Sequence, residues 1–214
     1  MSTRILVIRH GESVANCEKF FAGQNNIALT ELGVKQAEVA ADAMKDIKID
    51  KVFSSTLDRA YYTALPFAKS RGLEVVRIGG FIERDCGDWT GRTFAEVEKL
   101  YPEERRLWRE DSFNLTITGA KESSKESIQR IGNAVDALAR ENEGLTVLVA
   151  SHGGVIKALP YYFSHSKSAK LYNETPVPTN CSITEIVYDN GVGRLTRYSD
   201  DGYLKDLKSG AFII

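Results

Sequence analysis

Arg4-Ile-Leu-Val-Ile-Arg9 is a short apolar run near the start of the chain, and it ends abruptly in His10-Gly11-Glu12. An apolar run of this length, closed by polar residues, predicts a buried strand. The pattern returns late in the chain, where Thr146-Val-Leu-Val-Ala150 leads into Ser151-His152-Gly153-Gly154. Two predicted strands therefore run into a His-Gly pair. If these strands are neighbours in one sheet, their two imidazoles face one crevice.

The segments between these strands alternate between helical and extended patterns, which predicts an α/β fold. We expect a three-layer sandwich, in which helices flank both faces of a central, mostly parallel sheet. In such sheets ligands bind at the carboxyl ends of the strands. Helices are predicted at Thr30–Met44, at Leu57–Ser70 with a disturbance at Pro66, and at Ser127–Glu141; further strands are predicted at Lys51–Ser54 and Leu73–Ile78, with a hairpin of Ser182–Tyr188 and Gly193–Tyr198.

The stretch from Phe81 to Ser124 differs in character from the rest of the chain. It holds both tryptophans, Trp89 and Trp108, together with dense charge and two short predicted helices, at residues 93–101 and 102–110. It is too rich in aromatic residues for a linker. We therefore expect one domain over residues 1–214, with a cap inserted at about residues 84–124.

Composition excludes several classes of function. The 214 residues include 28 basic and 29 acidic side chains, so no global positive field would hold nucleic acid or an anionic membrane. Cys17, Cys86 and Cys181 are too few and scattered for a disulfide framework, and no CxxC pair indicates zinc. No signal peptide and no apolar stretch of about 18 residues is present, so a cytoplasmic location is expected. The oligomeric state stays open.

The two His-Gly strand ends suit phosphoryl transfer. This chemistry needs a nucleophile, cations around the phosphoryl oxygens and an acid for the leaving oxygen. Neutral imidazole is a competent nucleophile, and arginine offers planar donors that match phosphate. Arg9 adjoins His10, and Arg59 lies just after the second strand, so both can reach the crevice.

A series of motifs in this chain resembles the histidine phosphatase superfamily, the phosphoglycerate-mutase-like proteins. Its cap pattern is closest to the small broad-specificity phosphatases. The Arg-His-Gly tripeptide alone has little weight, but the blocks occur in family order. They are Arg9-His10-Gly11-Glu12-Ser13 with Asn16; Gly23-Gln24; Leu29-Thr30-Glu31-Leu32-Gly33 with Gln36-Ala37; Ser54-Ser55-Thr56-Leu57-Asp58-Arg59-Ala60 with Thr63-Ala64; Glu83, Gly87, Trp89 and Gly91; Glu122-Ser123 with Arg130; Ser151-His152-Gly153-Gly154; and Asn180.

The resemblance implies a role for each matched residue. His10 is expected to become phosphorylated, while Arg9, Arg59 and His152 hold the phosphoryl oxygens. Glu83 is implied as the proton donor and then as the base that activates water. The substrate-binding residues implied are Asn16, Gly23, Gln24 and Gly153. The resemblance implies no metal and no cofactor.

The chain departs from the family pattern at two positions. Lys121 stands where a glycine usually precedes the Glu-Ser pair, and Asn26 stands in place of a usual aspartate. Lys121 borders the cap and is a candidate to contact a second anionic group. The cap aromatics Tyr101, Trp108 and Phe113 are explained at least as well by packing in the core of the cap as by contact with the substrate.

The expected function is a metal-independent phosphomonoesterase that acts on a small phosphorylated metabolite through a phosphohistidine. The alternative is a phosphoglycerate mutase, which uses the same histidine but returns the phosphoryl group to its substrate. Mutases of this type carry a longer cap with a tryptophan before paired arginines, whereas Arg105 and Arg106 here precede Trp108. A catalytically inactive binder of phosphorylated partners fits less well, because the full set of catalytic candidates is present. A zinc hydrolase fits less well still, because the arginines adjacent to the histidines would repel a cation. The substrate itself stays open.

Overall fold

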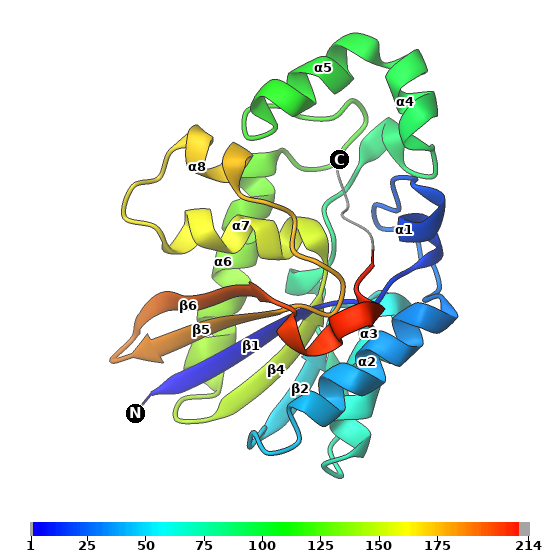
Figure 1. Ribbon diagram of the computed structural model, residues 1–214. Helices are drawn as coiled ribbons and strands as arrows, with labels where there is room; N and C mark the ends of the chain where they lie inside the picture. Colours follow the sequence, from blue (N-terminus) through cyan, green and yellow to red (C-terminus); the bar gives the residue numbers. More distant parts are fainter. Residues whose placement is uncertain (1, 210–214) are drawn as a thin grey trace.

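The computed structural model describes residues 2–209 of the chain (Figure 1). In this part of the chain one sheet of six strands has the order β3-β2-β4-β1-β5-β6. Neighbours among β3, β2, β4 and β1 run parallel, and β5 and β6 join as antiparallel strands. The bounds are β1 Thr3–Arg9, β2 Lys51–Ser54, β3 Val75–Arg77, β4 Thr146–Ser151, β5 Ile183–Asp189 and β6 Val192–Asp200.

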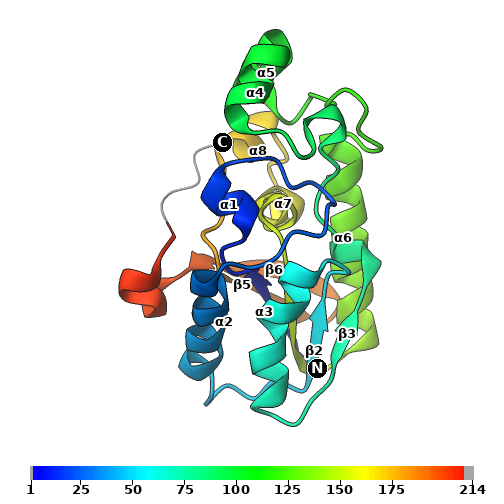
Figure 2. The same ribbon diagram turned by 90° about the vertical axis from the view of Figure 1, so that its right-hand side faces the viewer.

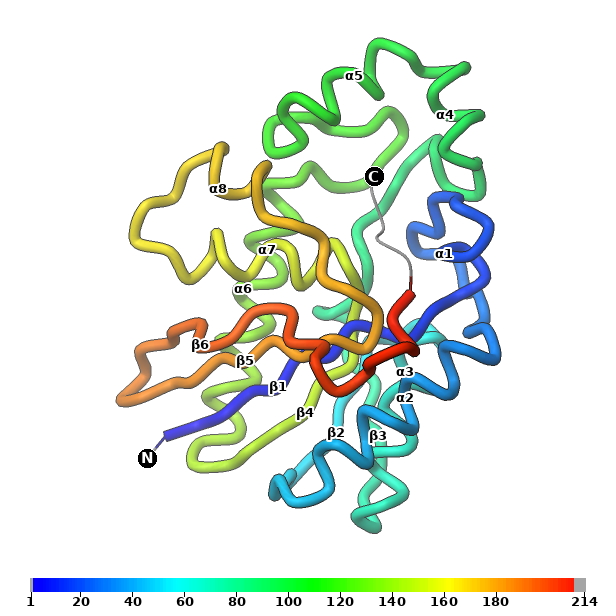
Figure 3. Tube along the Cα trace, viewed as in Figure 1, coloured from blue at the N-terminus to red at the C-terminus, as the bar shows by residue number. Residues whose placement is uncertain are grey.

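The two strands that run into His-Gly are neighbours, which meets the condition set by the sequence analysis. β1 and β4 pair in parallel, with Arg9 opposite Ser151 at their carboxyl ends. The tube in Figure 3 shows the two segments side by side, although more than 130 residues separate them in sequence. His10 follows Arg9 directly, and His152 follows Ser151 directly, so both imidazoles start from the same edge of the sheet.

Helices cover both faces of the sheet, which confirms the predicted three-layer α/β architecture. Alternate residues of β1 serve opposite faces, because side chains alternate along a strand. Ile5 and Val7 pack with α6 and α7, whereas Leu6 and Ile8 pack with α2 and α3. The helices are α1 Val14–Glu18, α2 Glu31–Ala43, α3 Asp58–Lys69, α4 Phe94–Leu100, α5 Pro102–Asp111, α6 Ser124–Glu141, α7 Gly153–Phe163 and α8 Ala169–Glu174, and short 3₁₀ helices lie at Gly79–Phe81, Gly87–Trp89 and Gly202–Leu207.

Three predictions about these elements need correction, two of them bounds and one a helix disturbance. The helix expected from Ser127 begins at Ser124, because Ser123 caps it by accepting from the amide of Glu126, whose carboxylate binds back to Ser123. The strand expected at Leu73–Ile78 is confined to β3, a sheet edge. Helix α3 continues through Pro66 without a break.

Residues 84–124 form a small structure beside the sheet. Figures 1 and 2 show α4 and α5 stacked away from the strands, beyond α7 and α8. This segment has its own apolar cluster, in which Trp89 and Val97 are fully buried beside Phe21 and Ile117. Tyr101 and Trp108 pack against that cluster, while Phe113 belongs to the main core. The aromatic residues of the segment therefore serve largely as core.

Among the described residues, no helix combines the length and apolar character needed to cross a bilayer.

Candidate active site

His10 lies directly beyond the end of β1 and is almost completely buried. Its amide donates to the carbonyl of Ser151 at 2.9 Å, which extends the β1–β4 pairing by one residue. Gly11, the next residue, donates its amide to Thr63 Oγ1 at 3.0 Å. A Cβ on Gly11 would overlap the backbone of Gly33 at the start of α2, so only glycine allows this close passage.

The His10 ring is held in one neutral tautomer. Nδ1 lies 2.7 Å from the carbonyl oxygen of Gly11, and a carbonyl only accepts, so Nδ1 carries the proton. Nε2 then keeps its lone pair. Burial lowers the pKa of His10 well below 6.5, and the positive charges of Arg59 and Arg9 lower it further. The imidazole is therefore uncharged at neutral pH, with a free lone pair on Nε2.

His152 lies beside His10. The two ring centroids are 5.3 Å apart and the planes are inclined by 57°. His152 is fully buried at the N-cap of α7, and its Nε2 lies 2.7 Å from Ser55 Oγ. Burial also lowers the pKa of His152 well below 6.5, and the charge of Arg59 adds to the effect. The two strand ends thus bring the two imidazoles together.

Two buried arginines border the histidines. The Arg9 guanidinium lies beside Gly153 and donates from Nη1 to the carbonyl of Pro178 at 2.5 Å. Burial lowers the pKa of Arg9 to about 10, a shift that Glu83 opposes and Arg59 reinforces. Arg59 is held by the loop before α2, because its two terminal nitrogens donate to Asn25 O and Gly23 O. Both side chains stay cationic at neutral pH.

Glu83 reaches the same place from the loop that precedes residues 84–124. Its Oε1 accepts from the amide of Arg84 at 2.8 Å, and Oε2 accepts from the amide of Gly154, in the first turn of α7, at 3.3 Å. A Cβ on Gly154 would lie 2.6 Å from Glu83 Oε1, so the glycine makes room for the carboxylate. The charge of Glu83 acts on both Arg9 and Arg59. The structure therefore brings Glu83 together with the four other predicted catalytic residues.

The predicted substrate-binding residues lie around this centre, mainly as supports. Asn16 Oδ1 accepts from the amide and hydroxyl of Ser13, which makes it part of a capping box on α1. Gln24 donates from Nε2 to the carbonyl of Glu83 at 3.0 Å. Gly23 has φ +48° and presents its carbonyl to Arg59. Gly153 lies against Arg9. Their role in substrate binding stays a prediction.

Several supporting residues had no role assigned from the sequence, although they lie in the motif blocks. Asn180 Nδ2 donates to the carbonyl of His10 at 2.9 Å and to Asn16 Oδ1 at 3.0 Å. Arg130 pairs with Glu122 and donates to the carbonyl of Ile82, next to Glu83. The contacts of Asn180 with His10 and Asn16, and of Arg130 with Ile82, join segments far apart in sequence, so residue type alone gave no signal for them.

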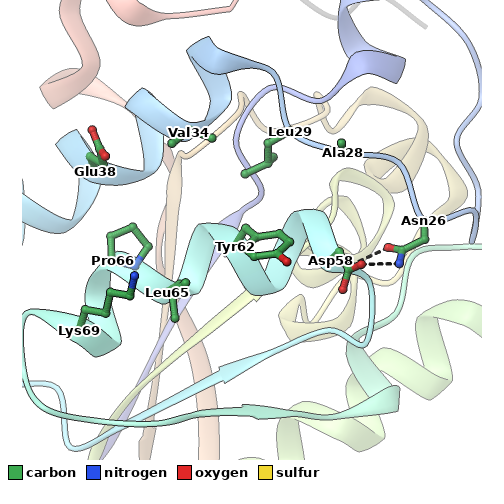
Figure 4. Close-up of a pocket in the computed structure, with 10 residues that line it drawn as sticks. All are labelled: Asn26, Ala28, Leu29, Val34, Glu38, Asp58, Tyr62, Leu65, Pro66 and Lys69. Atoms are coloured by element: carbon green, nitrogen blue, oxygen red, sulfur yellow. Dashed lines mark hydrogen bonds between the residues drawn. The ribbon is translucent and has the colours of Figure 1, made fainter.

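The two departures from the family pattern lie outside this centre. Asn26 exchanges two hydrogen bonds with Asp58, at 2.6 and 2.8 Å, at the start of α3 (Figure 4). An aspartate at position 26 would place two carboxylates in contact. Both residues line a surface groove of about 490 Å³ between α2 and α3, which contains none of the predicted catalytic residues. Lys121 is exposed, and its amide donates to Asp85 Oδ2.

Within residues 2–209, no group of three or more His, Cys, Asp or Glu side chains is arranged to hold a metal ion.

Comparison with known proteins assigns the family. Residues 5–201 match the family model of the histidine phosphatase superfamily (branch 1). The chain therefore belongs to this superfamily, as its motifs indicated. Mycobacterial relatives that are 34% identical over 94% of the chain are themselves longer, and the chain spans 55% of their length.

Other relatives have more specific names. A metal-independent phosphoserine phosphatase of Arabidopsis thaliana is 33% identical, over 80% of this chain and 73% of its own. A 2,3-bisphosphoglycerate-dependent phosphoglycerate mutase of Rhizobium meliloti is 34% identical, over 74% and 78%. Among solved structures, a mycobacterial glucosyl-3-phosphoglycerate phosphatase is 28% identical, with a TM-score of 0.83 over 94% of this chain and all of that one.

Proposed function

We propose that this member of the histidine phosphatase superfamily is a metal-independent phosphomonoesterase that works through a phosphohistidine at His10. The observation that carries the proposal is the balance of charge around the two facing histidines. Arg9 and Arg59 bring two buried positive charges to this place. A dianionic phosphoryl group would balance these two charges when Glu83 is in its carboxylic acid form, and buried guanidinium groups bind such a group strongly.

In the first step, the lone pair on His10 Nε2 attacks phosphorus. The P–N bond forms as the P–O bond to the substrate alcohol breaks, and the leaving oxygen takes a proton from Glu83. Arg9 and Arg59 stay charged throughout and stabilise the negative charge on the phosphoryl oxygens. Their positions are fixed beforehand, by Pro178 for Arg9 and by the loop carbonyls for Arg59.

In the second step, a water molecule attacks phosphorus from the side that the alcohol has left. Glu83, now a carboxylate, takes the proton of this water. The P–O bond forms, the P–N bond breaks, and the electron pair returns to His10 Nε2. Inorganic phosphate then leaves, and the site regains its starting protonation.

The substrate proposed is a small phosphorylated metabolite. The names of the relatives support this class, because they include phosphatases of phosphoserine and of a phosphoglycerate sugar ester. We further propose that residues 84–124 act as a cap over the site. Arg84, next to Glu83, supports this role: its guanidinium donates to Tyr172 on α8 and lies 4.8 Å from the Trp108 ring on α5.

Turnover of p-nitrophenyl phosphate is expected to survive EDTA with less than about twofold change, because arginines supply the charge that metal ions supply in other phosphatases. The measurement is kcat/KM before and after prolonged dialysis against the chelator, with a magnesium-dependent phosphatase as a positive control. Loss of turnover that a divalent metal restores would contradict the metal-free mechanism.

A second candidate, phosphoglycerate mutase, is favoured by the similarity to the mutase of Rhizobium meliloti. It shares the first step, but a phosphoglycerate takes the phosphoryl group from His10 in place of water. The order of the cap residues speaks against it, since Arg105 and Arg106 lie before Trp108 on α5.

With 3-phosphoglycerate and a bisphosphoglycerate primer, inorganic phosphate is expected to appear faster than 2-phosphoglycerate. The physical reason is that the phosphohistidine of a phosphatase must be open to water. Phosphate release and isomer formation are measured in the same reaction. Faster formation of 2-phosphoglycerate would make the mutase the better assignment.

A further inference from the structure

His152 has one ring nitrogen engaged and one without a partner. Nε2 lies 2.7 Å from Ser55 Oγ, whereas Nδ1 is buried and has no hydrogen-bond partner among the described residues. The ring is fully buried, so water does not readily satisfy this atom. Nδ1 is therefore the ring nitrogen that remains for a ligand.

Ser55 is held as firmly as the ring that it contacts. It follows β2 directly, is fully buried, and donates its amide to the carbonyl of Ala150 on β4 at 2.9 Å. Its Oγ accepts from the amide of Leu57, the N-cap residue of α3, at 3.2 Å. One lone pair of the hydroxyl is thus occupied, and the hydroxyl proton needs an acceptor.

The neutral His152 ring has two tautomers, and they differ in how well these groups are satisfied. With the proton on Nε2, the ring donates to Ser55 Oγ. The hydroxyl proton then has no acceptor among the described residues, and the Nδ1 lone pair would repel an anion. With the proton on Nδ1, the Ser55 hydroxyl donates to Nε2, and every polar hydrogen of the pair is used or offered to a ligand. Without a ligand, each tautomer leaves one buried donor without a partner, the Ser55 hydroxyl in the first and Nδ1–H in the second. The first tautomer also leaves the Nδ1 lone pair unpaired. Because each unsatisfied buried polar group costs about 1–3 kcal/mol, the second tautomer is favoured.

We propose that Ser55 is a positioning residue, which holds His152 as the Nδ1–H tautomer so that Nδ1–H donates to an oxygen of the bound phosphoryl group. The inference rests on the proposed function for the identity of the anion. It assigns His152 the role of a neutral donor, in addition to the two cationic arginines. It also assigns a task to the second serine of the Ser54-Ser55 pair, the one whose hydroxyl faces the ring.

The wild-type protein provides the first test, by ¹⁵N NMR of the imidazole nitrogens. The chain has three histidines, so a His165→Ala variant and a His10→Ala variant identify the His152 signals. The expected result is a protonated Nδ1 and an unprotonated Nε2 on His152 in the absence of ligand. A proton on Nε2 would overturn the proposal, whatever the variants of Ser55 do.

The second test compares Ser55→Ala with Ser54→Ala. Both serines are fully buried and lose the same atom, but the Ser54 hydroxyl donates to the carbonyl of Ser55 and not to the ring. Ser55→Ala is expected to move the His152 proton at least partly to Nε2 and to weaken the binding of inorganic phosphate about 10- to 100-fold. Ser54→Ala should leave the tautomer unchanged and the affinity within about threefold. An unchanged tautomer in Ser55→Ala would overturn the proposal.

Failure of this inference and failure of the proposed function have different signatures. The tautomer is read from the spectrum and does not depend on turnover. If wild-type His152 has the expected tautomer but the protein hydrolyses no phosphomonoester, the proposed function fails and the contact with Ser55 stands. If hydrolysis is found with a proton on Nε2, only the role of Ser55 fails.

Discussion

His10→Ala is expected to abolish phosphatase turnover, with a loss on the order of 10⁴–10⁶-fold in kcat, which is typical when a covalent nucleophile is removed. The reason is specific to the geometry. Nδ1 of His10 is committed to Gly11 O, so Nε2 is the one atom of the ring that can form the P–N bond. Neither Arg9 nor Arg59 can replace it, because both are protonated and have no lone pair to offer. The measurement is steady-state hydrolysis of p-nitrophenyl phosphate.

The matched control is His165→Ala, which removes an exposed histidine in the loop between α7 and α8. Its kcat/KM should stay within about twofold of wild type. In the wild-type protein, a rapid acid-free quench should trap phosphate on His10 as an acid-labile adduct. Phosphate found on Ser13 or Ser151 would contradict the assignment, and so would full activity of His10→Ala.

The position of the site could be predicted from the sequence because it depends on the strands. β1 and β4 are buried on both faces and are therefore continuous apolar runs. Both are followed by His-Gly, and parallel strands present their carboxyl ends at one edge. Arg9 and Arg59 follow from similar reasoning, since Arg9 is the last residue of β1 and Arg59 lies in the first turn of the helix that follows β2.

The residues that adjust the site could not be predicted in this way. The contact between Ser55 and His152 joins positions 97 residues apart, and it exists only because β2 pairs with β4. Glu83 likewise depends on the amide of Gly154, which approaches only in the folded chain. The short helices α1 and α8 were missed for another reason: with 5 and 6 residues, they are too short to show an apolar period.

The aspartates near Glu83 are poor alternatives as the proton donor. Asp85 accepts from the amides of Gly87 and Lys121, so both of its oxygens are used within the cap segment. Asp88 is exposed and lies against Gly119. Glu83, in contrast, lies close enough to Arg9 and Arg59 for its charge to act on both. Asp88→Asn is therefore a suitable control for a substitution of Glu83, because it removes the same charge from the same loop.

Glu83→Gln is expected to slow phosphorylation of His10 by an alkyl phosphate about 10²–10⁴-fold, because the leaving alkoxide needs a proton in the transition state. Phosphorylation by p-nitrophenyl phosphate should slow much less, since its phenolate leaves unaided. The first turnover must be measured apart from steady turnover, because activation of water in the second step also requires Glu83. Asp88→Asn should leave the rate of the first turnover unchanged for both esters. Equal losses for the two esters in Glu83→Gln would show that the carboxyl group is not the acid, and the proton would then have to reach the leaving oxygen from solvent.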